Sequence, residues 1–386
     1  MYDCIVLGAG VMGSCAAYNA AKNRKKTLLL EQFSLDHKNG SSHGASRIIR
    51  NCHNESNYVK MAHRAFQLWD EMGHLGGETL YTSCGLLWLG DEEGTIKRSN
   101  LLKENNNVQH QILAGKQIRQ KFPHLNYDEG NWHAVLDNQG GVIYAEKCLQ
   151  TSQKLFKQFG GDIKENCKVV DVIPGSIIKV ITEDGHTYET KQLIVAMGGW
   201  LNKLFPEIKI APTPNLVSVN FWKLKKEFED KEPLYNPDNL SPCLIIKKDD
   251  IDFFMLPGAD FKGQVKFGIH MGESIDIDNK DRNVADWMHL NPAKHMNEHM
   301  SDIDTTKPEK IVMCVYQVTD DSNFILDTHP KYGKNIAFGS GFNGTGFKFG
   351  ALIGEILNQI VDGKPINCCD MTFFSSTRVI TEKNIH

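Results

Sequence analysis

The sequence predicts an α/β fold in which a Rossmann-type dinucleotide-binding domain is joined to an α+β second domain built on a β-sheet. Three observations support this fold class. A glycine-rich turn, GAGVMG at 8–13, lies between a short apolar run and an alanine-rich helical stretch. Segments of the same style return in the middle and at the end of the chain. Between them, residues 211–317 change to a series of short β-rich segments.

The first elements form a complete βαβ unit. The apolar run Asp3–Leu7 predicts a strand, Ser14–Lys22 predicts an amphipathic helix, and Thr27–Leu30 predicts a second strand that ends at Glu31. The spacing is that of a dinucleotide-binding opening, in which the helix begins directly after the glycine turn.

Later segments continue both patterns. Helices are predicted at 148–159 and 353–361, and a glycine-rich turn at 339–346. Strands are predicted at 168–173, 178–181, 193–196, 216–222, 243–246, 253–256, 265–270 and 336–338. We therefore expect a discontinuous cofactor domain of residues 1–85, 142–205 and 318–386, and a substrate domain of residues 86–141 and 206–317.

Composition narrows the class of partner. The 386 residues are 41% hydrophobic and carry a net charge of −4, from 43 basic and 47 acidic side chains. This balance gives no electrostatic case for nucleic acid or an anionic membrane. No apolar run approaches the roughly 18 residues of a membrane span, and no signal pattern precedes the first strand. We expect a soluble intracellular protein with a small-molecule partner.

Cysteine usage indicates reduced thiols and no metal. Ten cysteines occur without a secretory signal, which favours free thiols over a disulfide framework. Cys368 and Cys369 are adjacent, but no second pair accompanies them at zinc spacing.

The glycine turn and the acidic residue after the second strand have separate roles in binding a dinucleotide. Gly8 permits the tight turn, Gly10 lets the backbone approach a pyrophosphate, and Gly13 allows close packing of helix on strand. Glu31 follows at the expected distance, where its carboxylate can accept hydrogen bonds from ribose hydroxyls and would repel a 2′-phosphate. NADP is disfavoured, while this motif alone leaves FAD and NAD open.

Five dispersed segments carry a resemblance to a known family. The chain resembles the monomeric sarcosine oxidases, and most closely their peroxisomal sarcosine and L-pipecolate oxidase branch, over nearly all of its length. The resemblance implies FAD and an architecture like that of glutathione reductase and D-amino acid oxidase. The segments are GSSHGASRIIR at 40–50, LDNQGGVIYA at 136–145, VKFGIH at 265–270, CVYQVTDDSNFILDTHP at 314–330 and GFNGTGFKFG at 341–350.

The resemblance also implies how FAD is held. Cys314 matches the family cysteine that carries the flavin through a thioether to its 8α-methyl group. His43 and Arg47 are the candidate cations that would stabilise negative charge on the ring during this attachment. Gly344 and Gly346 match the cofactor-binding glycines of the loop near the C-terminus. Without the resemblance, Cys314 would be interpreted as a small buried hydrophobic residue.

Four further residues match the family's substrate site. Arg50 and Lys348 are the expected pair for the substrate carboxylate, since a guanidinium fork matches a carboxylate and a lysine adds a point charge. Lys266 matches the family lysine near flavin N5 that promotes reaction with oxygen, where its charge would stabilise developing superoxide. His270, on the same predicted strand face, matches a histidine lining the substrate pocket. Each would otherwise be an ordinary surface charge or core histidine.

The expected reaction is oxidation of a small secondary amino acid by O2, with hydride transfer to the flavin, an imine product and H2O2. Sarcosine would give glycine and formaldehyde, whereas L-pipecolate or L-proline would give a cyclic imine. Three departures from the family bear on this choice: Phe254 lies near a common tyrosine, Thr345 replaces a histidine, and Ser46 replaces a frequent threonine. A less polar pocket favours a cyclic or bulkier amine.

Several alternatives stay open at this stage. The same Rossmann opening occurs in NAD-dependent dehydrogenases, and the nearest oxidase competitor is a glycine or D-amino acid oxidase with noncovalent FAD. A third alternative is a non-enzymatic binding module. The family branch implies a monomer in peroxisomes, yet the C-terminal tripeptide Asn384–His386 does not match the Ser-Lys-Leu address, so a cytoplasmic location is the alternative.

Overall fold

The glycine-rich turn belongs to an eight-stranded sheet assembled from three separate parts of the chain. The computed structural model describes residues 1–210, 212–279 and 282–380; Ala211 and the tripeptide Asn384–His386 lie outside them. At the centre of this sheet, β1 (Tyr2–Leu7) pairs in parallel with β2 (Thr27–Leu30) and with β12 (Thr187–Val195). The other strands are β9 (Asp162–Lys164), β10 (Val169–Ile173), β11 (Ile178–Thr182), β19 (Ile325–His329) and β20 (Gly333–Ser340).

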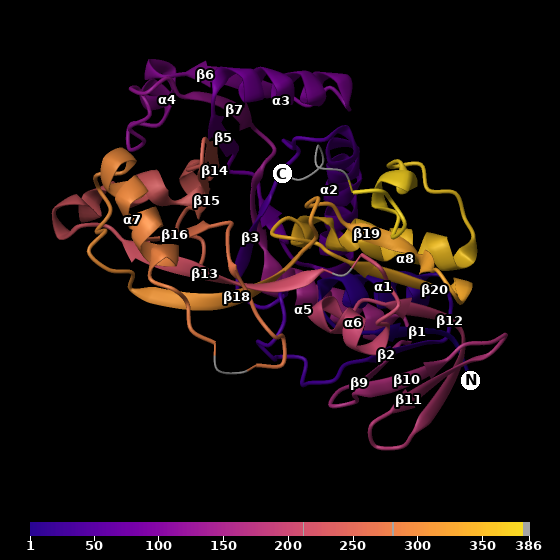
Figure 1. Ribbon diagram of the computed structural model, residues 1–386. Helices are drawn as coiled ribbons and strands as arrows, with labels where there is room; N and C mark the ends of the chain where they lie inside the picture. Colours follow the sequence, from indigo (N-terminus) through magenta and orange to yellow (C-terminus); the bar gives the residue numbers. More distant parts are fainter. Residues whose placement is uncertain (211, 280–281, 381–386) are drawn as a thin grey trace.

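Four helices pack together beside this sheet, three of them on its strands and the fourth on two of those helices (Figure 1). They are α1 (Val11–Lys22), α2 (Ser56–Gly76), α5 (Ala145–Gln158) and α8 (Gly350–Asp362). Helix α1 begins three residues before the predicted start, because the amide of Ser14 already bonds to the carbonyl of Gly10 at 2.8 Å. At Gly354 of α8, an added Cβ would lie 2.6 Å from the backbone of Cys15, so the two helices touch through their backbones.

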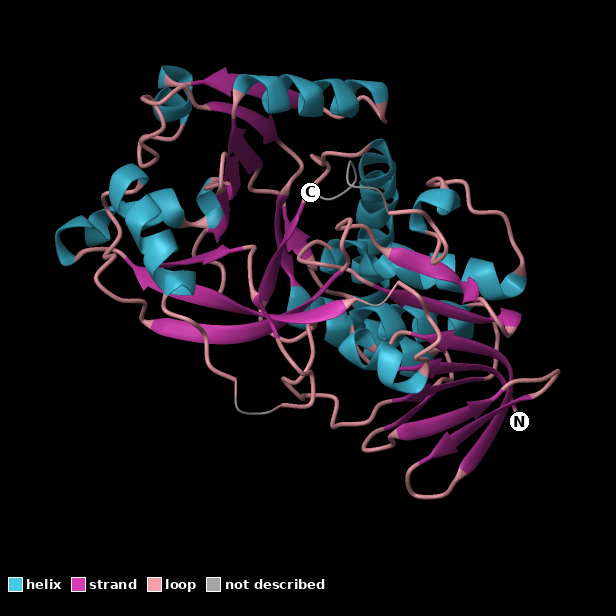
Figure 2. Cartoon of the chain, viewed as in Figure 1, coloured by secondary structure: helices cyan, strands magenta, loops and turns pink. Residues whose placement is uncertain are grey.

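The β-rich middle of the chain forms most of a second, nine-stranded sheet, drawn on the opposite side of the molecule (Figures 1 and 2). Its order is β17-β13-β16-β15-β14-β5-β7-β6, with β18 pairing β13. These strands are β5 (Leu86–Gly90), β6 (His110–Ala114), β7 (His133–Asp137), β13 (Thr213–Lys223), β14 (Cys243–Lys248), β15 (Ile251–Leu256), β16 (Gln264–Ile269), β17 (Glu273–Ser274) and β18 (Lys310–Val318). The four strands predicted between 216 and 270 all lie here, although the last ends at Ile269 and leaves His270 just beyond it.

A three-stranded sheet lies between the two large ones (Figure 1). It consists of β3 (Ser46–Ile49), β4 (Tyr81–Thr82) and β8 (Gly141–Tyr144). The remaining helices are α3 (Glu92–Glu104), α4 (Lys116–Lys121), α6 (Leu201–Leu204) and α7 (Trp287–His299), with 3₁₀ turns at 198–200, 226–235, 237–239, 346–349 and 371–374. The large sheets draw on the chain segments expected for the two domains, while the exact domain boundaries stay a prediction.

Candidate cofactor and substrate site

A cavity of about 610 Å³ runs from the glycine turn to the glycine-rich segment that precedes α8. Its wall combines loops of the eight-stranded sheet with strands of the nine-stranded sheet. It brings together all but one of the site residues predicted from the sequence, namely Gly8, Gly10, Glu31, His43, Arg47, Arg50, Lys266, His270, Cys314, Gly344, Gly346 and Lys348. Gly13 does not line the cavity and lies beneath it, against Gly8.

Gly8 and Gly13, at the two ends of the glycine turn, have no room for a side chain. Gly8 has a φ of +93°, and a Cβ there would lie 2.5 Å from the carbonyl oxygen of Ala196. A Cβ at Gly13 would lie 1.8 Å from the carbonyl oxygen of Gly8. Both obstacles are backbone atoms that cannot move aside. The turn therefore lets α1 begin directly at the cavity, where its N-terminus favours a pyrophosphate.

Glu31 is buried at the end of β2 and bonded to this turn. Its carboxylate accepts the amide of Ala9 at 2.7 Å and the amide of Phe33 at 3.1 Å, and His37 Nε2 lies 3.6 Å away. These bonds fix the carboxylate at the cavity wall, as a partner for ribose hydroxyls requires. The glycine cradle, the helix N-terminus and this carboxylate together fit an adenine dinucleotide.

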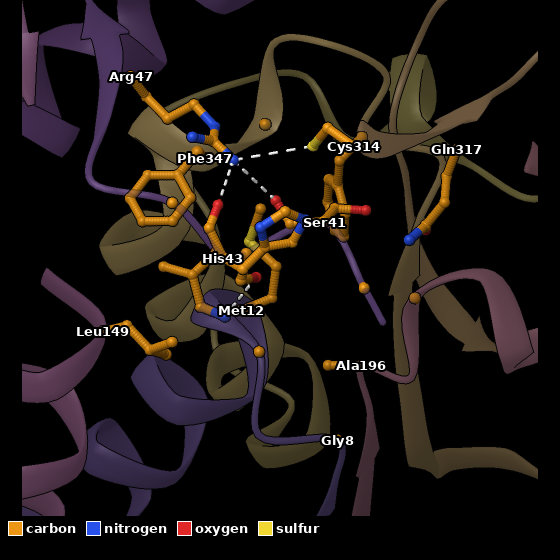
Figure 3. Close-up of a pocket in the computed structure, with 18 of the residues that line it drawn as sticks. Gly8, Met12, Ser41, His43, Arg47, Leu149, Ala196, Cys314, Gln317 and Phe347 are labelled. Atoms are coloured by element: carbon orange, nitrogen blue, oxygen red, sulfur yellow. Dashed lines mark hydrogen bonds between the residues drawn. The ribbon is translucent and has the colours of Figure 1, made fainter. Parts of the chain in front are cut away.

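Arg47 lies beside Cys314 at the other side of the cavity (Figure 3). Its Nη2 is 3.8 Å from the sulfur of Cys314 and donates to the carbonyls of His43 at 2.7 Å and Ser41 at 3.2 Å. Burial, and next the charge of Arg47, lowers the pKa of His43 to about 4. His43 is therefore neutral at pH 7, and the expectation of a cationic His43 is corrected. Arg47 supplies the positive charge next to the thiol.

Two buried cations line the part of the cavity that the sequence predicts to bind the substrate. Arg50 is 7% exposed and Lys348 is 5% exposed. The Nη1 of Arg50 bonds to the carbonyl of Cys52 and lies 3.1 Å from His53 Nδ1, and Lys348 Nζ donates to the carbonyl of Thr345 at 2.7 Å. Neither cation forms an ion pair within residues 1–210, 212–279 and 282–380.

Burial depresses the proton affinity of these cations. It lowers the pKa of Arg50 to about 10, and burial together with Arg50 holds the pKa of Lys348 well below its usual value. A carboxylate placed between them would reverse both effects, because an opposite charge favours the protonated form. The arrangement suits one small anion.

Lys266 has a different environment, in which its charge is partly neutralised. Its Nζ lies 2.5 Å from Asp260 Oδ2 and donates to the hydroxyl of Ser46 at 2.6 Å. Burial lowers the pKa of Lys266 to about 8, against the opposing effect of Asp260. Lys266 is therefore mostly protonated at pH 7 and loses its proton as the pH rises through about 8.

His270 and two aromatic side chains form a further part of the cavity wall. His270 Nδ1 lies 3.3 Å from the hydroxyl of Tyr316, and the ring of Phe254 is centred 4.8 Å from the imidazole. Burial lowers the pKa of His270, so its ring is neutral near pH 7. Gly344 makes room for this pair, since a Cβ there would lie 2.6 Å from the Tyr316 ring.

Sequence reasoning missed Asp260, Tyr316 and His53. Tyr316 lies within a segment already matched to the family, so alternation along the strand from Cys314 was a usable signal. Asp260 lies on the loop before β16, and His53 lies after the matched RIIR segment. Neither has a local pattern that separates it from an ordinary loop residue.

A search of protein families matches residues 3–360 to the family described as DAO, FAD dependent oxidoreductase. The chain belongs to this family. A putative sarcosine oxidase of Caenorhabditis elegans is 36% identical over 383 residues, covering 98% of this chain and 97% of the relative. The peroxisomal sarcosine oxidase of Homo sapiens is 36% identical over 374 residues, covering 93% and 92%. The resemblance to the sarcosine oxidases is thereby confirmed.

Solved structures confirm the predicted fold class of this FAD-dependent oxidoreductase. The open form of NikD, described as an unusual amino acid oxidase essential for nikkomycin biosynthesis, aligns with a TM-score of 0.82. It shares 18% sequence identity, and the alignment covers 97% of each chain. The family match identifies the chain as an enzyme that uses FAD, and it favours neither an NAD-dependent dehydrogenase nor a non-enzymatic module.

The described residues show neither a metal cluster nor a membrane-spanning helix. Among the described residues, no cluster of three or more histidine, cysteine, aspartate or glutamate side chains could hold a metal ion. No helix in the same part of the chain has the length and apolar character needed to cross a bilayer. All ten cysteines are free thiols in the structure.

The glycine cradle makes a first testable prediction. Gly13→Ala would force its Cβ against the carbonyl of Gly8 and displace the start of α1, so we expect FAD affinity to fall roughly 10-fold or more. The ratio of flavin to protein absorbance in the purified protein measures this loss. Gly185→Ala is the control, because its Cβ would meet open space, although its φ of +83° adds some backbone strain. Equal flavin content in Gly13→Ala and the wild type would contradict the prediction.

Proposed function

We propose that the protein oxidises a small secondary amino acid with O2, with sarcosine, L-pipecolate and L-proline as the candidate substrates. The observation that carries this proposal is the pair of buried cations, Arg50 and Lys348, with no carboxylate partner in the described chain and at one end of an FAD-sized cavity. The sarcosine oxidases at 36% identity support the choice of a secondary amine.

Arg50 and Lys348 would bind the substrate carboxylate and so set the direction in which the amine points. The backbone of Lys348 is anchored for this role, because the indole of Trp69 donates to its carbonyl at 2.7 Å. The neutral His270, Tyr316 and Phe254 add no positive charge that would repel a protonated amine, and they leave an apolar surface against its carbon atoms. This surface suits a cyclic substrate as well as sarcosine.

The bound flavin supplies the electron acceptor for the C–H bond next to nitrogen, which is chemistry that the side chains cannot perform. Residues of the chain exclude water and hold the amino acid in one orientation, which converts binding energy into a favourable reaction geometry. The imine product would hydrolyse after release, giving glycine and formaldehyde from sarcosine or a ring-opened product from a cyclic imine. Oxygen would be reduced to H2O2.

Lys266 would promote the reaction with oxygen. A positive charge stabilises the superoxide that develops when one electron reaches O2. The ion pair with Asp260 and the hydrogen bond to Ser46 hold this ammonium at a defined point of the cavity wall.

Cys314 would attach the flavin covalently. Thioether formation at the 8α-methyl group removes the thiol proton and one methyl hydrogen, and it transfers two electrons to the flavin, which O2 would then reoxidise. The guanidinium of Arg47, 3.8 Å from the sulfur, would place a positive charge beside the attacking atom. A glycine or D-amino acid oxidase with noncovalent FAD is the alternative, since a glycine oxidase is among the structural relatives.

We infer the cellular location and the oligomeric state of the protein from its relatives. The peroxisomal sarcosine oxidases of Homo sapiens and Mus musculus support a peroxisomal enzyme, where released peroxide would be contained. The bacterial relatives named monomeric sarcosine oxidases support a single-chain enzyme.

The carboxylate pair predicts a specific kinetic defect. Arg50→Ala and Lys348→Ala should each raise the KM for sarcosine or L-pipecolate roughly 10- to 100-fold, because each removes a charge-assisted hydrogen bond. Peroxide release measures the kinetics, and flavin absorbance should be unchanged. Lys294→Ala, an exposed lysine on α7, is the control. Loss of flavin in either variant would show that these residues hold the cofactor instead.

The covalent link predicts where the flavin goes after acid precipitation. Yellow colour should stay with the precipitated wild-type protein and move to the supernatant for Cys314→Ala. Cys243→Ala, which removes another buried thiol, is the matched control and should keep its flavin. Release of the flavin from the wild type would instead support the noncovalent oxidase.

The pKa of Lys266 predicts how the oxygen reaction depends on pH. Its ammonium is charged below a pKa of about 8 and neutral above it, so the rate at which O2 oxidises the reduced enzyme should fall as the pH rises through about 8. Lys266→Met should be slower by roughly 100-fold at low pH and lose the dependence. Lys266→Arg should stay fast at high pH, because arginine keeps its proton. Stopped-flow mixing of O2 with reduced enzyme that is free of amino acid excludes ionisation of the substrate as the cause. If the rate still falls with rising pH in Lys266→Met, the dependence belongs to another group.

A further inference from the structure

Two guanidinium groups approach one buried indole ring behind the cavity. The Cζ of Arg50 lies 4.6 Å from the centre of the Trp88 ring, and the Cζ of Arg98 lies 4.3 Å from it. Trp88 is 4% exposed on β5, and Arg98 is 8% exposed on α3. Arg50 lines the cavity, whereas Trp88 is not part of its wall.

Neither arginine forms an ion pair with a carboxylate in the described part of the chain. Asp137 and Asp252 act on Arg50, and Asp91 acts on Arg98, only from beyond ion-pair distance. The Nε of Arg98 donates to Asn54 Oδ1 at 2.8 Å, and Arg50 uses the carbonyl of Cys52 and the ring of His53. Burial lowers the pKa of both arginines. A desolvated cation without an anionic partner is unfavourable, and the negative face of an indole offsets part of that cost.

The backbone holds this indole rigidly. Trp88 pairs with Ile245 of β14 on one side and with Val135 of β7 on the other, so β5 is an interior strand of the nine-stranded sheet. Arg50, in contrast, follows the short strand β3 and extends from its end. A ring on a rigid strand can therefore set the orientation of a side chain that reaches it from another sheet.

We propose that Trp88 is a positioning residue that holds the guanidinium of Arg50 in the orientation that binds the substrate carboxylate. Arg98 lies against the same ring and places a second positive charge near that end of the site. The inference rests on the proposed role of Arg50 in carboxylate binding. Trp88 would therefore affect the affinity for the carboxylate only through Arg50.

Acetate tests the inference without turnover, because it offers a carboxylate and no oxidisable amine. We would titrate the flavin-loaded enzyme with acetate and follow the flavin absorbance. Trp88→Leu, which removes the aromatic face, should weaken acetate binding roughly 10-fold. Trp88→Phe should stay close to the wild type. Trp88→Met, whose longer and more flexible side chain adapts to an irregular space, serves as the apolar variant if Trp88→Leu does not accumulate.

A double-mutant cycle separates positioning from general damage. On an Arg50→Ala background, Trp88→Leu should cause no further loss of acetate affinity, because the residue acts through Arg50. Trp132→Leu is the matched control, as it is another buried tryptophan with a cation, Lys248, 4.7 Å from its ring centre. It should leave acetate affinity unchanged.

Three outcomes would overturn the inference: unchanged acetate affinity in Trp88→Leu, an equal loss with and without Arg50, or failure of Trp88→Phe to restore binding. Absence of acetate binding by the wild type would overturn it as well, by removing the carboxylate site. Wild-type enzyme that binds acetate normally but oxidises no secondary amino acid would contradict the proposed reaction and leave the positioning role supported.

Discussion

The site depends first on the close approach of two backbone segments, the residue after β1 and the start of α1. An added Cβ at Gly13 would lie 1.8 Å from the carbonyl oxygen of Gly8, so the helix can sit this close only because residue 13 has no side chain. The same strand end is flanked by β2 and β12, which run parallel to it. Parallel strands end at a common edge, and Glu31 and Ala196 therefore reach the same cavity. The place of the cofactor follows from this packing.

The nine-stranded sheet supplies the reactive side chains through the register of one strand. β13 pairs with β16 on one edge and with β18 on the other, and this places Phe221 opposite Lys266 and Val217 opposite Cys314. A slip of one residue in either pairing would turn the lysine or the thiol away from the cavity. The glycine turn that would hold the dinucleotide thus belongs to the eight-stranded sheet. The groups proposed to act on flavin and oxygen belong to the nine-stranded sheet.

Burial of positive charge is the basis of the selectivity that we propose for the site. Within the described residues, Lys266 has Asp260 as an ion-pair partner, whereas Arg50 and Lys348 contact backbone carbonyls, a neutral imidazole and aromatic rings without forming an ion pair. Desolvation makes these two cations unfavourable on their own, and the proposed substrate carboxylate would relieve that cost. An uncharged amine would leave them without an anion, so under the proposed function the cavity would discriminate by charge as well as by shape.

The sequence by itself determined the βαβ opening, its glycines and Glu31, because those features depend on neighbours along the chain. The matched segments also predicted residues that the fold then gathered into one cavity. Tertiary structure decided the rest. It made His43 neutral, left His270 beyond its strand, and brought Asp260, Trp88 and Arg98 to residues far away in sequence. It also formed α7 around Pro292, against the local preference of proline. Desolvation and long-range contacts exist only once the chain is packed, so no local pattern could report them.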